Sequence, residues 1–143
     1  MILLINLEKL NLFQNFLEGT IPSELGLLIN LKELNLIGTG ITGAIPTEIG
    51  ALSNLEKLEL GFNNLQGSIP SEIGQCSRLE WLVLAFNDLE GFIPSEIFDC
   101  TELAQLWLVQ NSLTGTIPTN IGQLSNLQGC KSSFRIVSLI ADV

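Results

Sequence analysis

Leucines recur along the chain at a fixed spacing of 24 residues. The first leucine of each unit is Leu7, Leu31, Leu55, Leu79, Leu103 and Leu127. Within a unit, Leu58 and Leu60 flank the polar Glu59, and this alternation predicts a short strand with its leucines turned inward. A unit of this size cannot bury its own apolar face. The fixed period therefore predicts a solenoid whose stacked units share one core.

An asparagine follows the strand in most units. The predicted asparagine ladder consists of Asn15, Asn63, Asn87 and Asn111. A buried amide can bond turn backbone through both its donors and its carbonyl, so a column of amides can tie one coil to the next. The second unit has Thr39 at this position, and its hydroxyl replaces only part of an amide. We expect the ladder to be weakest at Thr39.

The remainder of each unit predicts turns and one short helical segment. Gly67 permits a bend that a Cβ would block, and Pro70 keeps the preceding Ile69 extended. Ser71 and Glu72 follow, where a hydroxyl would cap a helical turn and a carboxylate would suit its N-terminus. The same order of residue types recurs in the other units, with small departures.

This unit resembles the plant-specific class of leucine-rich repeat, which is also common in algal proteins. The resemblance rests on the Gly-x-Ile-Pro segment inside a 24-residue unit and runs from Leu7 to about Gln128. It implies an α/β solenoid, a right-handed superhelix with a parallel concave β-sheet and short helical turns on the convex side. It also implies protein or peptide binding, as in the repeat regions of receptor-like kinases and receptor-like proteins.

The period divides the chain into three parts. Residues 1–6 are in phase with the end of a unit and are interpreted as the remnant of a preceding repeat; residues 7–126 form five repeats; residues 127–143 form an incomplete sixth repeat and an irregular tail. The apolar start has no basic region and is too short for a signal peptide. No stretch approaches the roughly 18 apolar residues that a membrane span needs.

Charge and composition exclude several kinds of function. The net charge is −9 and no cluster of lysines or arginines exists, which argues against nucleic acid as a partner. The chain has no histidine, so Ser-His and Cys-His catalysis are excluded and the commonest metal ligand is missing. A Gly-rich phosphate loop is also lacking. We therefore expect no enzyme activity, no cofactor and no metal.

Two of the three cysteines share one repeat position. Cys76 and Cys100 therefore stack on adjacent coils, which lie about 5 Å apart, a spacing that permits a disulfide. The alternative, which we favour, is a pair of buried free thiols that serve as small apolar residues.

The outward positions of the strands change character along the array. The first column alternates in sign through Lys9, Glu33 and Lys57, which we expect to pair across strands. Later repeats present large apolar residues instead, and clustered exposed aromatics are typical of a binding hot spot. The predicted ligand-binding residues are Phe62, Trp81, Val83, Phe86, Trp107, Val109 and Glu59. Glu56, Glu59 and Glu80 lie at the side for a basic group. The alternative for Phe62 and Phe86 is that they only pack on their neighbours.

These observations predict a module that binds a protein or peptide on its concave face. We interpret it as a fragment of an extracellular or cell-surface receptor-like protein. Two alternatives stay open, a secreted inhibitor of cell-wall hydrolases and a structural spacer without a ligand. The identity of the ligand and the oligomeric state do not follow from the sequence.

Overall fold

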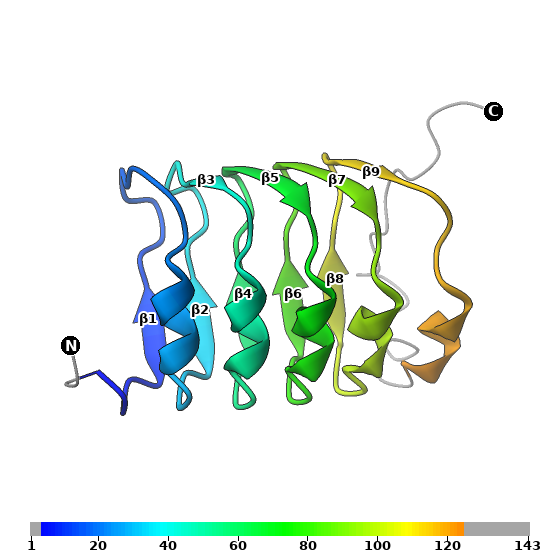
Figure 1. The fold of residues 1–143 in the computed structure, drawn as a ribbon, viewed down its shortest axis with the longest axis horizontal. Helices are drawn as coiled ribbons and strands as arrows, with labels where there is room; N and C mark the ends of the chain where they lie inside the picture. Colours follow the sequence, from blue (N-terminus) through cyan, green and yellow to red (C-terminus); the bar gives the residue numbers. More distant parts are fainter. Residues whose placement is uncertain (1–3, 125–143) are drawn as a thin grey trace.

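The computed structural model describes residues 4–124, which form a stack of coils (Figure 1). Each complete coil contains a strand, a crossing segment and a short 3₁₀ helix, which is labelled η. In chain order the elements are β1 (Lys9–Asn11), η1 (Ser23–Leu27), β2 (Glu33–Asn35), β3 (Thr42–Gly43), η2 (Thr47–Ala51), β4 (Lys57–Glu59), β5 (Asn64–Ser68), η3 (Ser71–Gln75), β6 (Trp81–Val83), β7 (Asp88–Phe92), η4 (Ser95–Asp99), β8 (Gln105–Trp107), β9 (Ser112–Thr114) and η5 (Thr119–Gln123).

The first strands of the coils form one parallel sheet. Within the described residues its order is β1-β2-β4-β6-β8. The register keeps the repeat of the sequence, since Lys9 lies opposite Glu33 and Glu33 lies opposite Lys57. The outward columns expected from the sequence are therefore the columns of this sheet. The predicted solenoid with a parallel sheet and short helical turns is confirmed.

The leucine columns fill the space between the strands and the helical turns. Leu31, Leu34, Leu55, Leu58, Leu79 and Leu82 are all fully buried. Each such side chain contributes roughly 1.5–3 kcal/mol of hydrophobic stabilisation. The equivalent leucines of the first coil, Leu7 and Leu10, are only partly buried, because no described coil packs on their outer side.

The asparagine column links successive coils through the backbone. Asn87 donates from Nδ2 to the carbonyls of Leu60 and Leu84, both at 3.0 Å, and its Oδ1 accepts from the amide of Leu65 at 3.0 Å. Asn111 repeats this arrangement one coil later. At the other end of the column, and within the part of the chain that the structure describes, the exposed Asn15 bonds only within its own turn, to the carbonyl of Leu12 at 2.9 Å and that of Phe13 at 3.4 Å.

Thr39 interrupts this ladder. Its hydroxyl lies 2.9 Å from the Leu36 carbonyl and 3.1 Å from Asn63 Oδ1, but within residues 4–124 it makes no bond back to the first coil. Asn63 joins the third coil to the second in the regular way, because its Oδ1 accepts from the amides of Thr39 and Gly40 while its Nδ2 reaches the Leu36 carbonyl. This column therefore joins the second and third coils, whereas between the first and second coils its side-chain link is missing and other side chains, such as Asn30 on the Ile5 carbonyl, make the connection.

A second parallel sheet, which the leucine period does not predict, runs along one flank. In the described part of the chain its order is β3-β5-β7-β9, and Figure 1 shows these strands along the top of the stack. Its register does not follow the sequence repeat, because Gln66 lies opposite Asp88 and Glu90 lies opposite Ser112. Each pairing thus slips by two residues relative to the first sheet. A slip of two preserves which side chains face out, but it makes equivalent positions lie diagonally.

The helical turns begin differently from the prediction. The residue before each 3₁₀ helix is proline, and its carbonyl accepts the first bond of the turn, as in Leu25 N to Pro22 O at 3.0 Å. No serine or threonine side chain caps a helix in residues 4–124; the Ser71 hydroxyl instead lies 3.4 Å from the Glu72 carboxylate. The predicted hydroxyl cap is therefore wrong. Proline occupies the N-cap position and fixes its extended geometry. The serine or threonine is therefore the first helical residue, one position past the site from which a hydroxyl caps a helix.

A glycine inside each of the first three helical turns permits close packing of the coils. A Cβ built on Gly26, Gly50 or Gly74 would lie only 2.4–2.6 Å from a glutamate carbonyl oxygen of the next coil. Phe98 occupies the same repeat position in η4 and is fully buried. The junction after η4 therefore accommodates a ring where the earlier junctions accommodate no side chain.

The ends of the chain lie partly outside the described residues. Residues 1–3 and 125–143 are not described, which includes Cys130, the predicted sixth repeat and the tail. At the start, the Leu7 amide bonds the Leu4 carbonyl at 2.9 Å, as Leu31 bonds Leu28 at 2.8 Å. The division into 1–6, 7–126 and 127–143 stays a prediction. Among the helices of the described part, none has the length and apolar character to cross a membrane.

Candidate functional site

The concave face, meaning the solvent side of the first sheet, carries an ion-paired column at one end. Lys9 Nζ lies 3.0 Å and Lys57 Nζ 3.4 Å from the same Glu33 oxygen. The hydrogen bond from Lys9 is the main reason that the pKa of Glu33 lies below its ordinary value. The predicted cross-strand pairs are confirmed. Lys57 also lies over the Trp81 ring, 4.9 Å from its centroid, so it joins the charged and aromatic halves of the face.

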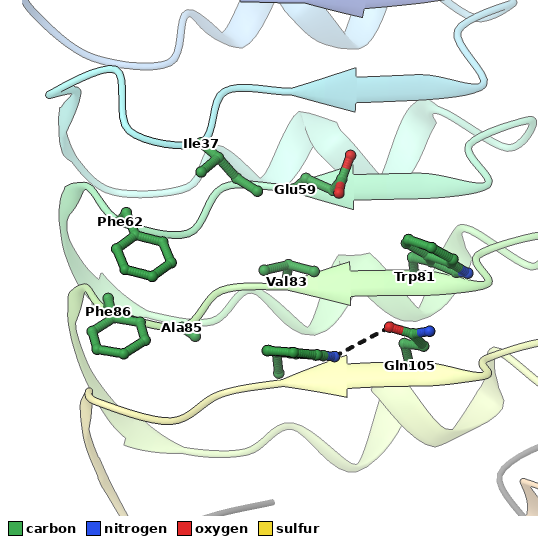
Figure 2. Close-up of a pocket in the computed structure, with 9 residues that line it drawn as sticks. Ile37, Glu59, Phe62, Trp81, Val83, Ala85, Phe86 and Gln105 are labelled. Carbon is green, nitrogen blue, oxygen red and sulfur yellow. Dashed lines mark hydrogen bonds between the residues drawn. The ribbon is translucent and has the colours of Figure 1, made fainter. Parts of the chain in front are cut away.

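An apolar hollow of about 250 Å³ lies beside this column, over the coils of β4, β6 and β8 (Figure 2). It is lined by Ile37, Glu59, Phe62, Trp81, Val83, Ala85, Phe86, Gln105 and Trp107. Six of the seven predicted binding residues are among them. The seventh, Val109, does not line the hollow.

The two tryptophans are less exposed than outward positions on a strand would suggest. Trp81 and Trp107 are both half-buried, because the sheet packs other side chains against them. Trp107 lies opposite Val83, and its Nε1 donates to Gln105 Oε1 at 3.3 Å, the bond that Figure 2 marks. Trp81 lies opposite Gln105 rather than Trp107. The indoles thus stand diagonally and act as walls of the hollow.

Phe62 and Phe86 form a stacked pair at the other end of the hollow (Figure 2). Their ring centroids are 4.3 Å apart and their planes differ by 14°. They do pack on each other, yet 57% of Phe62 and 42% of Phe86 stay accessible. Both have a left-handed backbone, with φ of 56° and 59°, a conformation that costs a residue with a side chain roughly 1–2 kcal/mol. The fold therefore places two bulky aromatic residues in a backbone conformation that glycine adopts without strain.

Glu59 is the one ionisable residue among those lining the hollow. Partial burial is the main cause that raises the pKa of its carboxyl, and the nearby Glu33 raises it further, while Lys57 acts in the opposite direction. Glu59 makes no ion pair within the described residues, in contrast to Glu33. The hollow thus combines apolar walls with a single partly desolvated carboxylate.

The two stacked cysteines are buried free thiols, as favoured from the sequence. Cys76 Sγ lies 3.4 Å from the Ile49 carbonyl, and Cys100 Sγ lies 3.5 Å from that of Ile73. Burial raises the pKa of Cys76 to about 12 and that of Cys100 to about 11, so neither thiol is poised for nucleophilic chemistry. No group of three or more potential metal ligands gathers anywhere in residues 4–124.

Comparisons with known proteins place the chain in a family. The family model of a leucine-rich repeat region matches residues 4–138. A search of curated proteins finds no match.

Several solved structures share the fold. One is the ectodomain of the plant membrane receptor kinase GASSHO1/SCHENGEN3 from Arabidopsis thaliana in complex with CASPARIAN STRIP INTEGRITY FACTOR 2, with 42% identity, a TM-score of 0.84, and coverage of 85% of this chain and 15% of that one. A second is the plant peptide hormone receptor RGFR1 in complex with RGF2. It has 40% identity, a TM-score of 0.83, and coverage of 85% of this chain and 19% of that one.

A third similar structure is the Arabidopsis receptor kinase HAESA in complex with the peptide hormone IDA and the co-receptor SERK1. It has 38% identity, a TM-score of 0.81, and coverage of 83% of this chain and 20% of that one. The chain thus spans about a fifth or less of the length of these receptor ectodomains. The repeat, the fold and the family match agree: this chain belongs to the leucine-rich-repeat family, in the plant-type class found in receptor-kinase ectodomains.

Proposed function

We propose that this chain is a non-catalytic module that binds a peptide or a protein segment on its concave face. The observation that carries the proposal is the apolar hollow between the Phe62–Phe86 pair and the two tryptophans. Its volume of about 250 Å³ is below the roughly 300–1,000 Å³ of sites that enclose a small molecule. It suits one or two anchoring side chains of a chain that lies across the strands.

The aromatic lining supports binding rather than a purely structural role. Tryptophan is strongly enriched among the residues that dominate binding energy, and such residues cluster in partly desolvated pockets. A spacer would need leucines in the core but has no use for two tryptophans on the solvent side of a sheet. The half-burial of Trp81 and Trp107 adds a benefit, since side chains held by their neighbours lose little entropy when a ligand arrives.

The similar structures support the same proposal from a second direction. RGFR1 is a peptide hormone receptor whose structure contains RGF2, and HAESA is a receptor kinase whose structure contains the peptide hormone IDA. By analogy we place this chain outside the cell or at its surface, as a part of a longer receptor-like protein. A protein or peptide is the partner, and no catalytic step is assigned to any residue.

A display library of random dodecapeptides, selected on the immobilised chain, tests the proposal. The double variant Trp81→Ala/Trp107→Ala removes the walls of the hollow, and Phe16→Ala/Leu27→Ala removes an equal number of large apolar residues that lie exposed elsewhere. We expect peptides selected on the wild type to bind the tryptophan variant at least about tenfold more weakly, because hot-spot truncations cost 2 kcal/mol or more, and to bind the control variant unchanged.

Two results would overturn the proposal. Equal binding of the selected peptides to the wild type and the tryptophan variant would remove the hollow as the site. Failure to select any peptide on the wild type would favour the spacer.

A further inference from the structure

One outward column of the concave face contains a gap. Gln14, Gly38, Phe62, Phe86 and Gln110 occupy the same repeat position and share a left-handed backbone, with φ between 54° and 65°. Only Gly38 lacks a side chain. Among the described residues, a Cβ built on Gly38 would find a single atom within 4 Å beyond its chain neighbours, Gln14 Cγ at 3.7 Å. No atom of Phe62 therefore covers this point.

The gap leaves one face of an aromatic ring free. Phe86 covers one face of Phe62 in the stacked pair, and 57% of Phe62 stays accessible, so its other face is open to a ligand. Adjacent parallel strands lie about 4.8 Å apart, so Gln14 and Phe62 are separated by about twice that distance. This interval leaves room for one flat group at stacking distance from the Phe62 ring.

A carboxylate without an ion-pair partner in the described residues shares the hollow with this ring. Glu59 lines the hollow together with Ile37 and Phe62, and Figure 2 shows Ile37 drawn between the other two. The charged groups that act on Glu59 are Lys57 and Glu33. These two are already joined, since Lys57 Nζ contacts Glu33 and covers Trp81. Glu59 is left as a partly buried negative charge in an acidic chain.

We propose that this gap accepts the arginine side chain of a peptide ligand, stacked on the free face of Phe62 and paired with the Glu59 carboxylate. The aliphatic stem of the arginine would pack on Ile37. The inference rests on the proposed function, because it assumes that a peptide lies on the concave face, and it deepens that proposal by naming one side chain that the face selects.

The chemistry distinguishes arginine from the other candidates. A guanidinium is planar, weakly hydrated and always charged, so it can stack on a ring and donate two bonds to a carboxylate at the same time. A lysine ammonium could pair with Glu59, but it is strongly hydrated and has no plane to stack. An uncharged ring could stack on Phe62 but would bury Glu59 further without a partner, which is costly.

The test uses Nα-acetyl-arginine amide as the probe and the Ile37 δ1 methyl signal of the labelled chain as the reporter. We expect a saturable shift of this signal, and binding of the matched lysine amide that is roughly fivefold weaker, because an ammonium is more strongly hydrated and cannot lie flat on the ring. Glu59→Gln, which keeps the shape and removes the charge, should weaken arginine binding roughly tenfold, since charge-assisted bonds are about twice as strong as neutral ones.

Filling the gap gives the sharpest comparison. Gly38→Phe extends the aromatic column, at a backbone conformation that phenylalanine already adopts at Phe62 and Phe86, and should abolish the arginine response. Gln110→Phe adds the same side chain at the far end of the column and should leave the response intact. If Gly38→Phe does not fold, Gly38→Gln replaces it, because Gln14 and Gln110 show that glutamine accepts this conformation.

Equal affinity for arginine and lysine amides, an unchanged response in the gap-filled variant, or no shift of Ile37 at all would overturn the inference. These failures are distinct from failure of the proposed function. Peptides anchored by Trp81 and Trp107 can still be selected when the gap has no preference for arginine. An intact arginine response together with peptides that ignore both tryptophans would refute only the wider proposal.

Discussion

Replacing Asn87 with alanine tests whether the asparagine ladder holds neighbouring coils together. The substitution removes three hydrogen bonds, each worth about 0.5–1.5 kcal/mol net, to Leu60, Leu84 and Leu65. The two carbonyls keep a second donor, because Asn63 and Asn111 also bond them. The Leu65 amide loses the acceptor that Asn87 provides, and an unpaired buried donor costs about 1–3 kcal/mol. We expect a total loss of about 3 kcal/mol.

Asn15→Ala is the matched control, since it is the same substitution in the same repeat position. Asn15 is exposed, and its bonds to described residues stay within its own turn, so water can replace its amide. Its loss should cost less than about 1 kcal/mol. Thr39→Asn works in the opposite direction, because an amide there can reach the Leu12 carbonyl of the first coil. It should stabilise the chain by about 1 kcal/mol, the value of one hydrogen bond.

Urea unfolding monitored by tryptophan fluorescence measures these differences, because both tryptophans lie in strands of the fourth and fifth coils. The slope of the transition should stay constant, so that the midpoints report stability alone. If Asn15→Ala and Asn87→Ala lower the free energy of unfolding equally, or if both lower it by less than about 1 kcal/mol, the ladder does not hold the coils together.

Gly50→Ala should destabilise by roughly 1–3 kcal/mol in the same assay, because its Cβ would lie 2.6 Å from the Glu72 carbonyl. Gly122→Ala, whose Cβ would meet no atom of residues 4–124 within 4 Å, should have a smaller effect, and equal effects would contradict the close packing of the coils. Burial raises the pKa of Glu59, so its charge destabilises the fold above that raised pKa, and this destabilisation vanishes below the ordinary value of 4.5. Glu59→Gln should therefore raise the melting temperature at pH 7 but not at pH 3.5. A gain at both pH values would refute the raised pKa as the cause. Cys76 and Cys100, with thiol pKa values of about 12 and about 11, should resist iodoacetamide at pH 8 until urea unfolds the chain, as the masses of the peptides that contain them would show. Rapid labelling of both in the native state would contradict their burial.

The first sheet could be predicted almost completely from the sequence. Its register equals the period of the leucines, so a column such as Lys9, Glu33 and Lys57 follows from the 24-residue spacing alone. The second sheet could not be predicted in this way. Its strands slip by two residues at each step, so pairs such as Gln66 and Asp88 hold different positions in their units and no periodic signal joins them.

The site was predictable in its members but not in its shape. Alternation along a strand says that Trp81 and Trp107 face outward. It does not say that Lys57 covers one indole and that Gln105 binds the other, which depends on contacts across strands. Gly38 shows the same limit. In the sequence it is a missing side chain, and only the shared left-handed backbone of its column shows what its absence leaves open.

The buried Phe98 has a consequence for how such an array can change over generations. In units that carry glycine at this position, the following coil leaves no room for a Cβ. A duplicate of the second or third unit would therefore pack against its neighbours in the same way as the original. The fourth unit is not interchangeable in this sense, because its ring needs a wider junction behind it. Unequal recombination that lengthens the array should therefore succeed more often when it duplicates the glycine-bearing units than when it duplicates the unit with Phe98.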